Sequence, residues 1–90
     1  MWYYCVMKKK HKRTLEKIYT RPISANIYWK DIESLFIALG ADISERAGSR
    51  IAVYLFGEIQ VYHRPHPTPT TDKGAVASVR RWLENNEVTP

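Results

Sequence analysis

The chain has 90 residues and a formal net charge of +5, from 14 Lys and Arg against 9 Asp and Glu. A chain of this length forms one domain with one modest core, because it buries only about 60–65% of the surface exposed on unfolding. Its apolar content of 44% excludes disorder throughout, and a single cysteine excludes an internal disulfide, which is typical of a cytoplasmic protein.

The excess of positive charge lies in the first 22 residues. Residues 1–7 are apolar but far too few to cross a bilayer, which takes about 20. The basic residues follow this stretch, whereas a secretory signal has them in front, so we predict no membrane association and regard Met7 as a plausible natural start. Without the five basic residues of 8–13, nine basic residues would balance nine acidic ones. Such a tract either solubilises the chain or binds nucleic acid; the residues expected to bind are Lys8, Lys9 and Lys10.

A short helix is predicted over residues 8–20. Leu15 and Ile18 stand at the spacing of one helical face, and the helix is expected to end before Pro22, because the residue before a proline avoids helical geometry. His11 lies among the charges and is expected to face solvent.

Two further helices are predicted from apolar stripes. The first covers residues 29–39, with Gly40 as its C-terminal cap and a stripe of Ile32, Leu35, Phe36 and Leu39. The second covers residues 73–86, with a stripe of Val76, Val79 and Leu83. Its N-terminal cap is expected at Thr70, Thr71 or Asp72.

Residues 48–67 form the segment on which we expect function to depend. Residues 50–56 and 58–63 alternate in polarity like two strands, joined by a tight turn at Phe56-Gly57. A weaker edge strand is predicted over residues 42–47. Polarity alone assigns to the buried face Ile51, Val53, Leu55, Ile59, Val61 and His63. The exposed face is then expected to carry Tyr54, Phe56, Tyr62 and Arg64.

This order predicts an α+β fold with a three-stranded antiparallel sheet and helices packed on one face. The open aromatic and basic face suits base stacking or the docking of a partner. The same rings would also suit the cross-strand pairs of a half-buried sheet.

The sequence lacks the residues that several kinds of chemistry need. No glycine-rich phosphate loop is present, and Ser49 has no evident base. His63 and His66 lack an obvious third metal ligand, so we predict neither a metal nor another cofactor. RNA cleavage without metal needs an acid, a base and a cation at the phosphate.

The exposed loop makes His66 the better proton carrier in such a reaction, with His63 either assisting it or serving a structural role. Arg50 and Arg64 could hold the phosphate. The remaining possibility is that the hairpin only binds and catalyses nothing.

The chain from about residue 23 to 88 resembles the HicA-type toxins of bacterial toxin–antitoxin pairs. The resemblance is carried by WKDIESLFIALGA, GSR, IAVYLFGEIQVYH, RPHP and DKGAVASVRRWLENNEV. It implies a fold similar to double-stranded RNA-binding domains, metal-independent cleavage of mRNA and a HicB-type antitoxin as partner. Residues 1–22 lie outside this core, giving a basic tail with a short helix followed by a HicA-like domain over 23–90.

In the HicA-type toxins that this chain resembles, a catalytic histidine follows the Gly-Ser turn. Here Gly48 and Ser49 match, but the next residue is Arg50. The resemblance therefore directs the expected chemistry to the other end of the hairpin, with His66 as the main acid–base group and His63 beside it. RNA contacts are expected from Arg50, Arg64, Gly48, Ser49, Tyr54 and Tyr62, besides the three lysines.

We accordingly predict a cytoplasmic endoribonuclease that arrests translation, with mRNA and an antitoxin as partners and no small-molecule cofactor. Two alternatives belong to other classes. One is an RNA-binding module without catalysis, and the other is a protein-interaction module that uses the outer face of the sheet.

Overall fold

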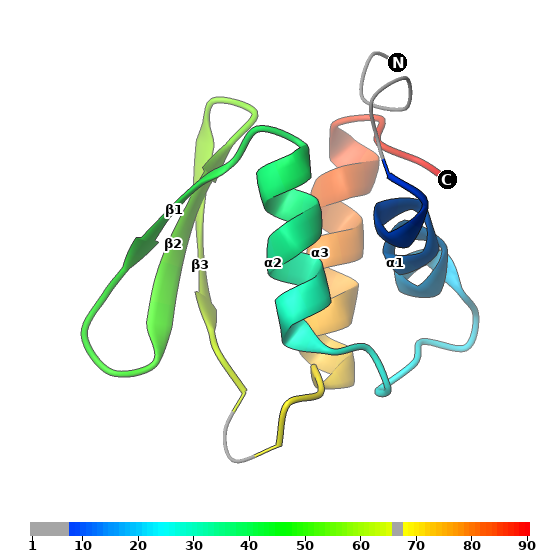
Figure 1. Ribbon diagram of the computed structural model, residues 1–90, viewed down its shortest axis with the longest axis horizontal. Coiled ribbons are helices and arrows are strands. Elements are labelled where there is room, and N and C mark those ends of the chain that lie inside the picture. The colour runs from blue at the N-terminus through cyan, green and yellow to red at the C-terminus, as the bar shows by residue number, and fades with distance from the viewer. Residues whose placement is uncertain (1–7, 66–67) are drawn as a thin grey trace.

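The computed structural model describes residues 8–65 and 68–90. Predictions about residues 1–7 and about His66 therefore lie outside the described residues. The elements are α1 (Lys9–Tyr19), α2 (Trp29–Ala38), β1 (Asp42–Glu45), β2 (Arg50–Leu55), β3 (Glu58–His63) and α3 (Lys73–Asn85). The three helices lie on one side of the three-stranded sheet, which confirms the predicted α+β fold (Figure 1).

The ends of α2 and α3 follow local sequence signals. After α2, Gly40 has a φ of 100° and donates its N–H to the Ile37 carbonyl, while the Ala41 N–H donates to Phe36. These two bonds make the Schellman ending, which a glycine adopts without strain. The Asp72 carboxylate caps α3 by accepting the Ala75 N–H.

The strands are antiparallel and lie in the order β1-β2-β3. Phe56 and Gly57 both have positive φ, 59° and 73°, as a two-residue type I′ hairpin turn requires. This turn pairs Leu55 with Glu58, and the register continues with Val53 opposite Gln60.

The register reverses the faces that we predicted for β3. Directly opposed residues share a face, so Tyr62, opposite Ile51, points into the core and is buried. Ile59 and Val61, predicted to be buried, are each 56% exposed on the outer face. The prediction was wrong because it followed the polarity of β3 alone. A two-residue turn fixes which residues of β3 pair with those of β2, and this pairing decides which side chains of β3 face the core.

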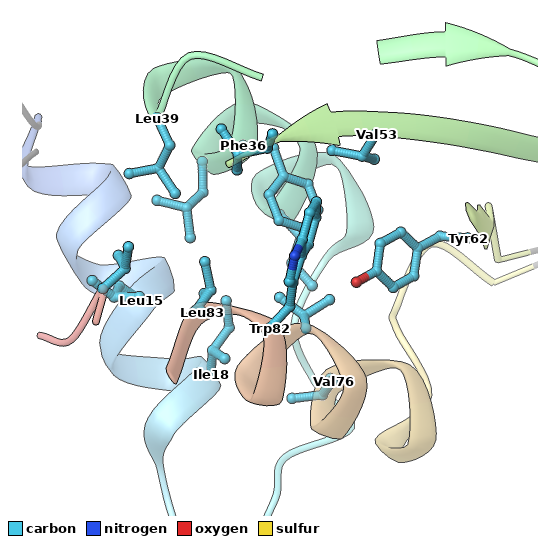
Figure 2. Close-up of a cluster of buried hydrophobic side chains, with 14 of the residues drawn as sticks. Leu15, Ile18, Phe36, Leu39, Val53, Tyr62, Val76, Trp82 and Leu83 are labelled. Atoms are coloured by element: carbon cyan, nitrogen blue, oxygen red, sulfur yellow. The ribbon is translucent and has the colours of Figure 1, made fainter. Parts of the chain in front are cut away.

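An aromatic cluster joins the sheet to the helices. The Phe36 ring centroid lies 6.0 Å from that of Tyr62 and 5.7 Å from that of Trp82. Trp29 lies 5.6 Å from Tyr62. Figure 2 shows Tyr62 turned from β3 toward α3 and the Trp82 ring.

Helix α1 belongs to the same core. Its Leu15 and Ile18 are fully buried with Leu83 of α3. The Tyr19 hydroxyl also donates to the Val88 carbonyl at 2.7 Å, which links the end of α1 to the C-terminal segment.

Candidate functional site

The structure brings the Gly48-Ser49 turn and the end of β3 to one place. Because the hairpin is antiparallel, Arg50 at the start of β2 lies directly opposite His63 at the end of β3. One step further, the Arg64 N–H donates to the Ser49 carbonyl at 2.8 Å. The Gly-Ser turn and the Arg64 end, which the sequence analysis weighed separately, are therefore neighbours.

His63 lies on the outer face of the sheet and is exposed. The prediction that it points inward was wrong, for the same reason of register that corrects Tyr62. In an antiparallel ladder, pairs that exchange backbone hydrogen bonds alternate with pairs that do not. Because Ser49 and Arg64 are hydrogen-bonded, the next pair, Arg50 and His63, is of the second kind. In such pairs the Cα atoms are about 4.5 Å apart and the side chains are close. The exposed imidazole of His63 and the exposed guanidinium of Arg50 thus lie next to each other on the outer face.

Arg64 is held by two carboxylates and does not extend from the outer face as predicted. Its Nε lies 2.9 Å from Glu33 Oε2, its Nη2 donates to Glu33 Oε1 at 3.3 Å, and its Nη1 lies 3.4 Å from Glu45 Oε2. The hydrogen bond to Glu33 is the main cause of a raised pKa for Arg64. A phosphate at Arg64 would have to compete with these carboxylates.

Arg50 makes fewer side-chain contacts than Arg64. Among the described residues, its side chain donates a hydrogen bond from Nε to the carbonyl of Ala47, at 3.2 Å. A neutral carbonyl leaves the guanidinium charge uncompensated, so Arg50 is the better placed arginine for an anion.

Glu33 and Glu45 are the site residues that the sequence analysis missed. Glu33 accepts hydrogen bonds from both Arg64 and the Trp29 indole, and so fixes the exit of β3 against α2. Glu33 and Arg64 are 31 positions apart. No local spacing signals a contact of that kind.

A pocket opens beside Arg64, between α2 and the segment that leaves β3. Its volume is about 490 Å³, within the range of small-ligand sites. Its lining combines rings and apolar groups with a few charges and comprises Trp29, Lys30, Glu33, Ser34, Ile37, Arg64, Pro65 and Pro69.

The outer sheet face carries an apolar strip. Tyr54 is 55% exposed and pairs directly with Ile59, and Val61 lies opposite the small Ala52. The predicted place of Tyr54 on this face is thus found, whereas Tyr62 lies in the core. Arg50 and His63 lie at the end of the strip.

The basic tract begins α1, and Lys8, Lys9 and Lys10 are exposed. His11 is only 8% exposed, so the expectation that it faces solvent was wrong. Burial, with Lys10 and Lys8 nearby, lowers the pKa of His11, and Asp31 acts in the opposite direction. The docking of α1 against α2 buries this residue, and polarity along α1 could not indicate that.

Within residues 8–65 and 68–90, no cluster of three or more His, Cys, Asp or Glu side chains is arranged to hold a metal ion. In the same part of the chain, no helix has the length and apolar character needed to span a bilayer.

Comparison with known proteins supplies the family. The family model described as HicA toxin of bacterial toxin–antitoxin systems matches residues 29–84, more than half of the chain. No curated protein and no solved structure shows significant similarity. The match covers α2, nearly all of α3 and the whole sheet, including β2 and β3, which carry Arg50 and His63. The chain therefore belongs to the HicA toxin family and is the toxin of a toxin–antitoxin pair.

Proposed function

We propose that this toxin is a metal-independent endoribonuclease that cleaves mRNA at the end of the hairpin. The observation that carries the proposal is the exposed Arg50–His63 pair, which combines a proton carrier with an uncompensated cation. Family membership supports it, because a toxin that arrests growth needs a target in the cell. His66, three residues after His63 in the chain, supplies the second proton carrier.

The reaction needs only proton transfers and charge stabilisation. One histidine removes the proton of a ribose 2′-hydroxyl, whose oxygen attacks the adjacent phosphorus. The bond from phosphorus to the 5′-oxygen breaks, and the second histidine protonates that oxygen. Arg50 stabilises the additional negative charge on the phosphate oxygens. We assign the main acid–base role to His66 and its complement to His63.

RNA incubated with the purified protein in EDTA tests this proposal. We expect cleavage to persist at an unchanged rate, with fragments that end in a 2′,3′-cyclic phosphate and begin with a 5′-hydroxyl. RNA made entirely of 2′-O-methyl nucleotides should bind and remain intact, because it has no 2′-hydroxyl proton to lose. Bound but uncut ordinary RNA, with or without Mg²⁺, would contradict the nuclease and leave a binding module.

We further propose that a HicB-type antitoxin covers the outer sheet face. The family implies an antitoxin partner, and the strip of Tyr54, Ile59 and Val61 exposes large apolar side chains that a partner would bury. A partner on this strip would also cover Arg50 and His63 at its end. Masking of the reactive side chains would then follow directly from docking.

Tyr54→Ala is expected to weaken binding of the antitoxin by about 10-fold or more, as loss of an exposed aromatic anchor does. Binding is best measured by calorimetry with the protein encoded beside this toxin. Ser44→Ala, on the same outer face in β1, serves as the control and should change affinity less than twofold. If both variants bind like the original, the antitoxin docks elsewhere.

A further inference from the structure

A third basic side chain lies in line with Arg50 and His63. A loop of three residues, 47–49, joins β1 to β2, and across it the Arg46 N–H donates to the Arg50 carbonyl at 2.9 Å. This hydrogen bond continues the antiparallel register of β1 and β2 by one step. Arg46 therefore lies directly opposite Arg50, on the side of β2 away from His63.

The three side chains share the outer face of the sheet. Directly opposed residues lie on the same face, and Arg46, Arg50 and His63 are all exposed. Cα atoms are about 5.5 Å apart in a hydrogen-bonded pair and about 4.5 Å apart in a pair without such bonds. The three residues thus form a row of about 10 Å across all three strands, on the face turned away from the helices (Figure 1).

The two arginines of this row lack a carboxylate partner. Like charges directly opposite each other are unfavourable in a sheet. Glu45 precedes Arg46, but it lies on the inner face, where it binds Arg64. Asp42, the acidic strand residue of the outer face, lies about 13 Å from Arg46 along the strand. In the part of the chain that the structure describes, the Arg46 side chain has no hydrogen bond, ion pair or ring contact.

An anion between Arg46 and Arg50 would remove their repulsion. The planar guanidinium group matches the oxygens of a phosphate, to which it donates two parallel hydrogen bonds. Arg64 is less suited to this task, since Glu33 and Glu45 already hold its side chain. The row therefore offers two arginines without carboxylate partners beside the exposed imidazole of His63.

We propose that Arg46 and Arg50 together hold the RNA phosphate at which the chain is cleaved. The inference rests on the proposed function, because it assumes that RNA lies at the end of the hairpin. Arg46 takes the role that sequence reasoning gave to Arg64. During cleavage both guanidinium groups would stabilise the negative charge that develops on the phosphate oxygens, while His63 exchanges a proton beside them.

The first test measures binding of the uncleavable 2′-O-methyl RNA over a range of salt concentrations. Arg46→Ala should weaken binding about 5- to 10-fold, as the loss of one charge-assisted contact does. The double variant with Arg46→Ala and Arg50→Ala should reduce the slope of log K against log salt by about 0.7, the value for one phosphate of a single strand. A reduction of about 1.4 would mean two separate phosphates and would overturn the shared site.

Arg81→Ala is the matched control. It removes the same charge from an exposed position of α3, on the other side of the sheet. Affinity should change less than twofold, with an unchanged slope. Arg46→Ala should also be no less stable than the original protein in urea at low salt, because it relieves a repulsion between like charges. A clearly lower urea midpoint would assign Arg46 a structural role instead.

The second test uses cleavage of ordinary RNA in EDTA. At saturating protein, Arg46→Ala should lower the single-turnover rate by about 10²- to 10³-fold, the usual cost of losing one donor to a developing anion. Arg81→Ala should cleave at the original rate.

Equal RNA affinities of Arg46→Ala and Arg81→Ala would overturn the inference. The same holds if Arg46→Ala binds RNA normally and loses affinity only for the antitoxin, because Arg46 would then pair with an acidic group of that partner. These outcomes are separable from failure of the nuclease. A protein that binds RNA through Arg46 but leaves ordinary RNA intact contradicts cleavage and retains the phosphate site. Cleavage at the full rate by Arg46→Ala contradicts the role of Arg46 alone.

Discussion

His63→Ala should lower the rate of RNA cleavage in EDTA by about 10²- to 10⁴-fold, the usual contribution of a positioned acid or base. The prediction is motivated by the position of the imidazole, which is exposed and lies opposite Arg50 at the end of the hairpin. Single-turnover cleavage of a labelled RNA measures it. Binding of the uncleavable 2′-O-methyl analogue should change only a few-fold, because the charge of Arg50 remains.

Two comparisons make this result specific. Ser44→Ala alters the same sheet face without touching the reactive end and should cleave at the original rate. His66→Ala should be at least as severe as His63→Ala if the two histidines divide the acid and base roles. Full activity in both histidine variants would show that neither transfers the proton.

Much of the fold was predictable because its signals are local. The stripes of α2 and α3, the Gly40 ending and the Phe56-Gly57 turn each depend on a few adjacent residues. The turn also contained enough information to predict correctly which residues of β3 face the core. Two residues between the strands require Leu55 and Glu58 to be paired, which places Tyr62 beside Ile51 in the core.

The polarity of β3 was misleading for a physical reason. Its inner face carries Glu58 and Gln60, which are polar but lie near the tip and edge of the sheet. Glu58 accepts the Trp82 indole N–H at 2.6 Å. An edge strand can thus turn polar side chains toward a helix and apolar ones toward solvent, which is the reverse of the usual pattern.

The candidate site was predictable only in part. The two-residue turn pairs Leu55 with Glu58, and counting outward from that pair places Arg50 opposite His63. The sequence alone could therefore have predicted that these two residues are neighbours. The carboxylates around Arg64 and the burial of His11 depend on how α2 docks on the sheet and α1 on α2. Such contacts link distant segments, and no spacing within either segment encodes them.

The largest effect on stability is expected from Phe36→Ala. Phe36 is fully buried and its ring packs against Tyr62 and Trp82, so it connects α2 to both the sheet and α3. Truncating a buried phenylalanine costs about 3–5 kcal/mol. A 90-residue domain is stable by only about 5–13 kcal/mol. The variant should therefore lose a large part of its free energy of unfolding.

Ile37→Ala is the matched control, since Ile37 is the next residue of α2 and is 60% exposed. Urea denaturation followed by tryptophan fluorescence should show a much lower midpoint for Phe36→Ala and a change below about 0.5 kcal/mol for Ile37→Ala. Equal shifts would mean that the aromatic cluster does not hold α2 in place. Because Glu33 on the same helix fixes Arg64, loosening α2 should also disturb the hairpin end. A loss of toxicity in Phe36→Ala therefore has to be read against its folded fraction before it is attributed to the site.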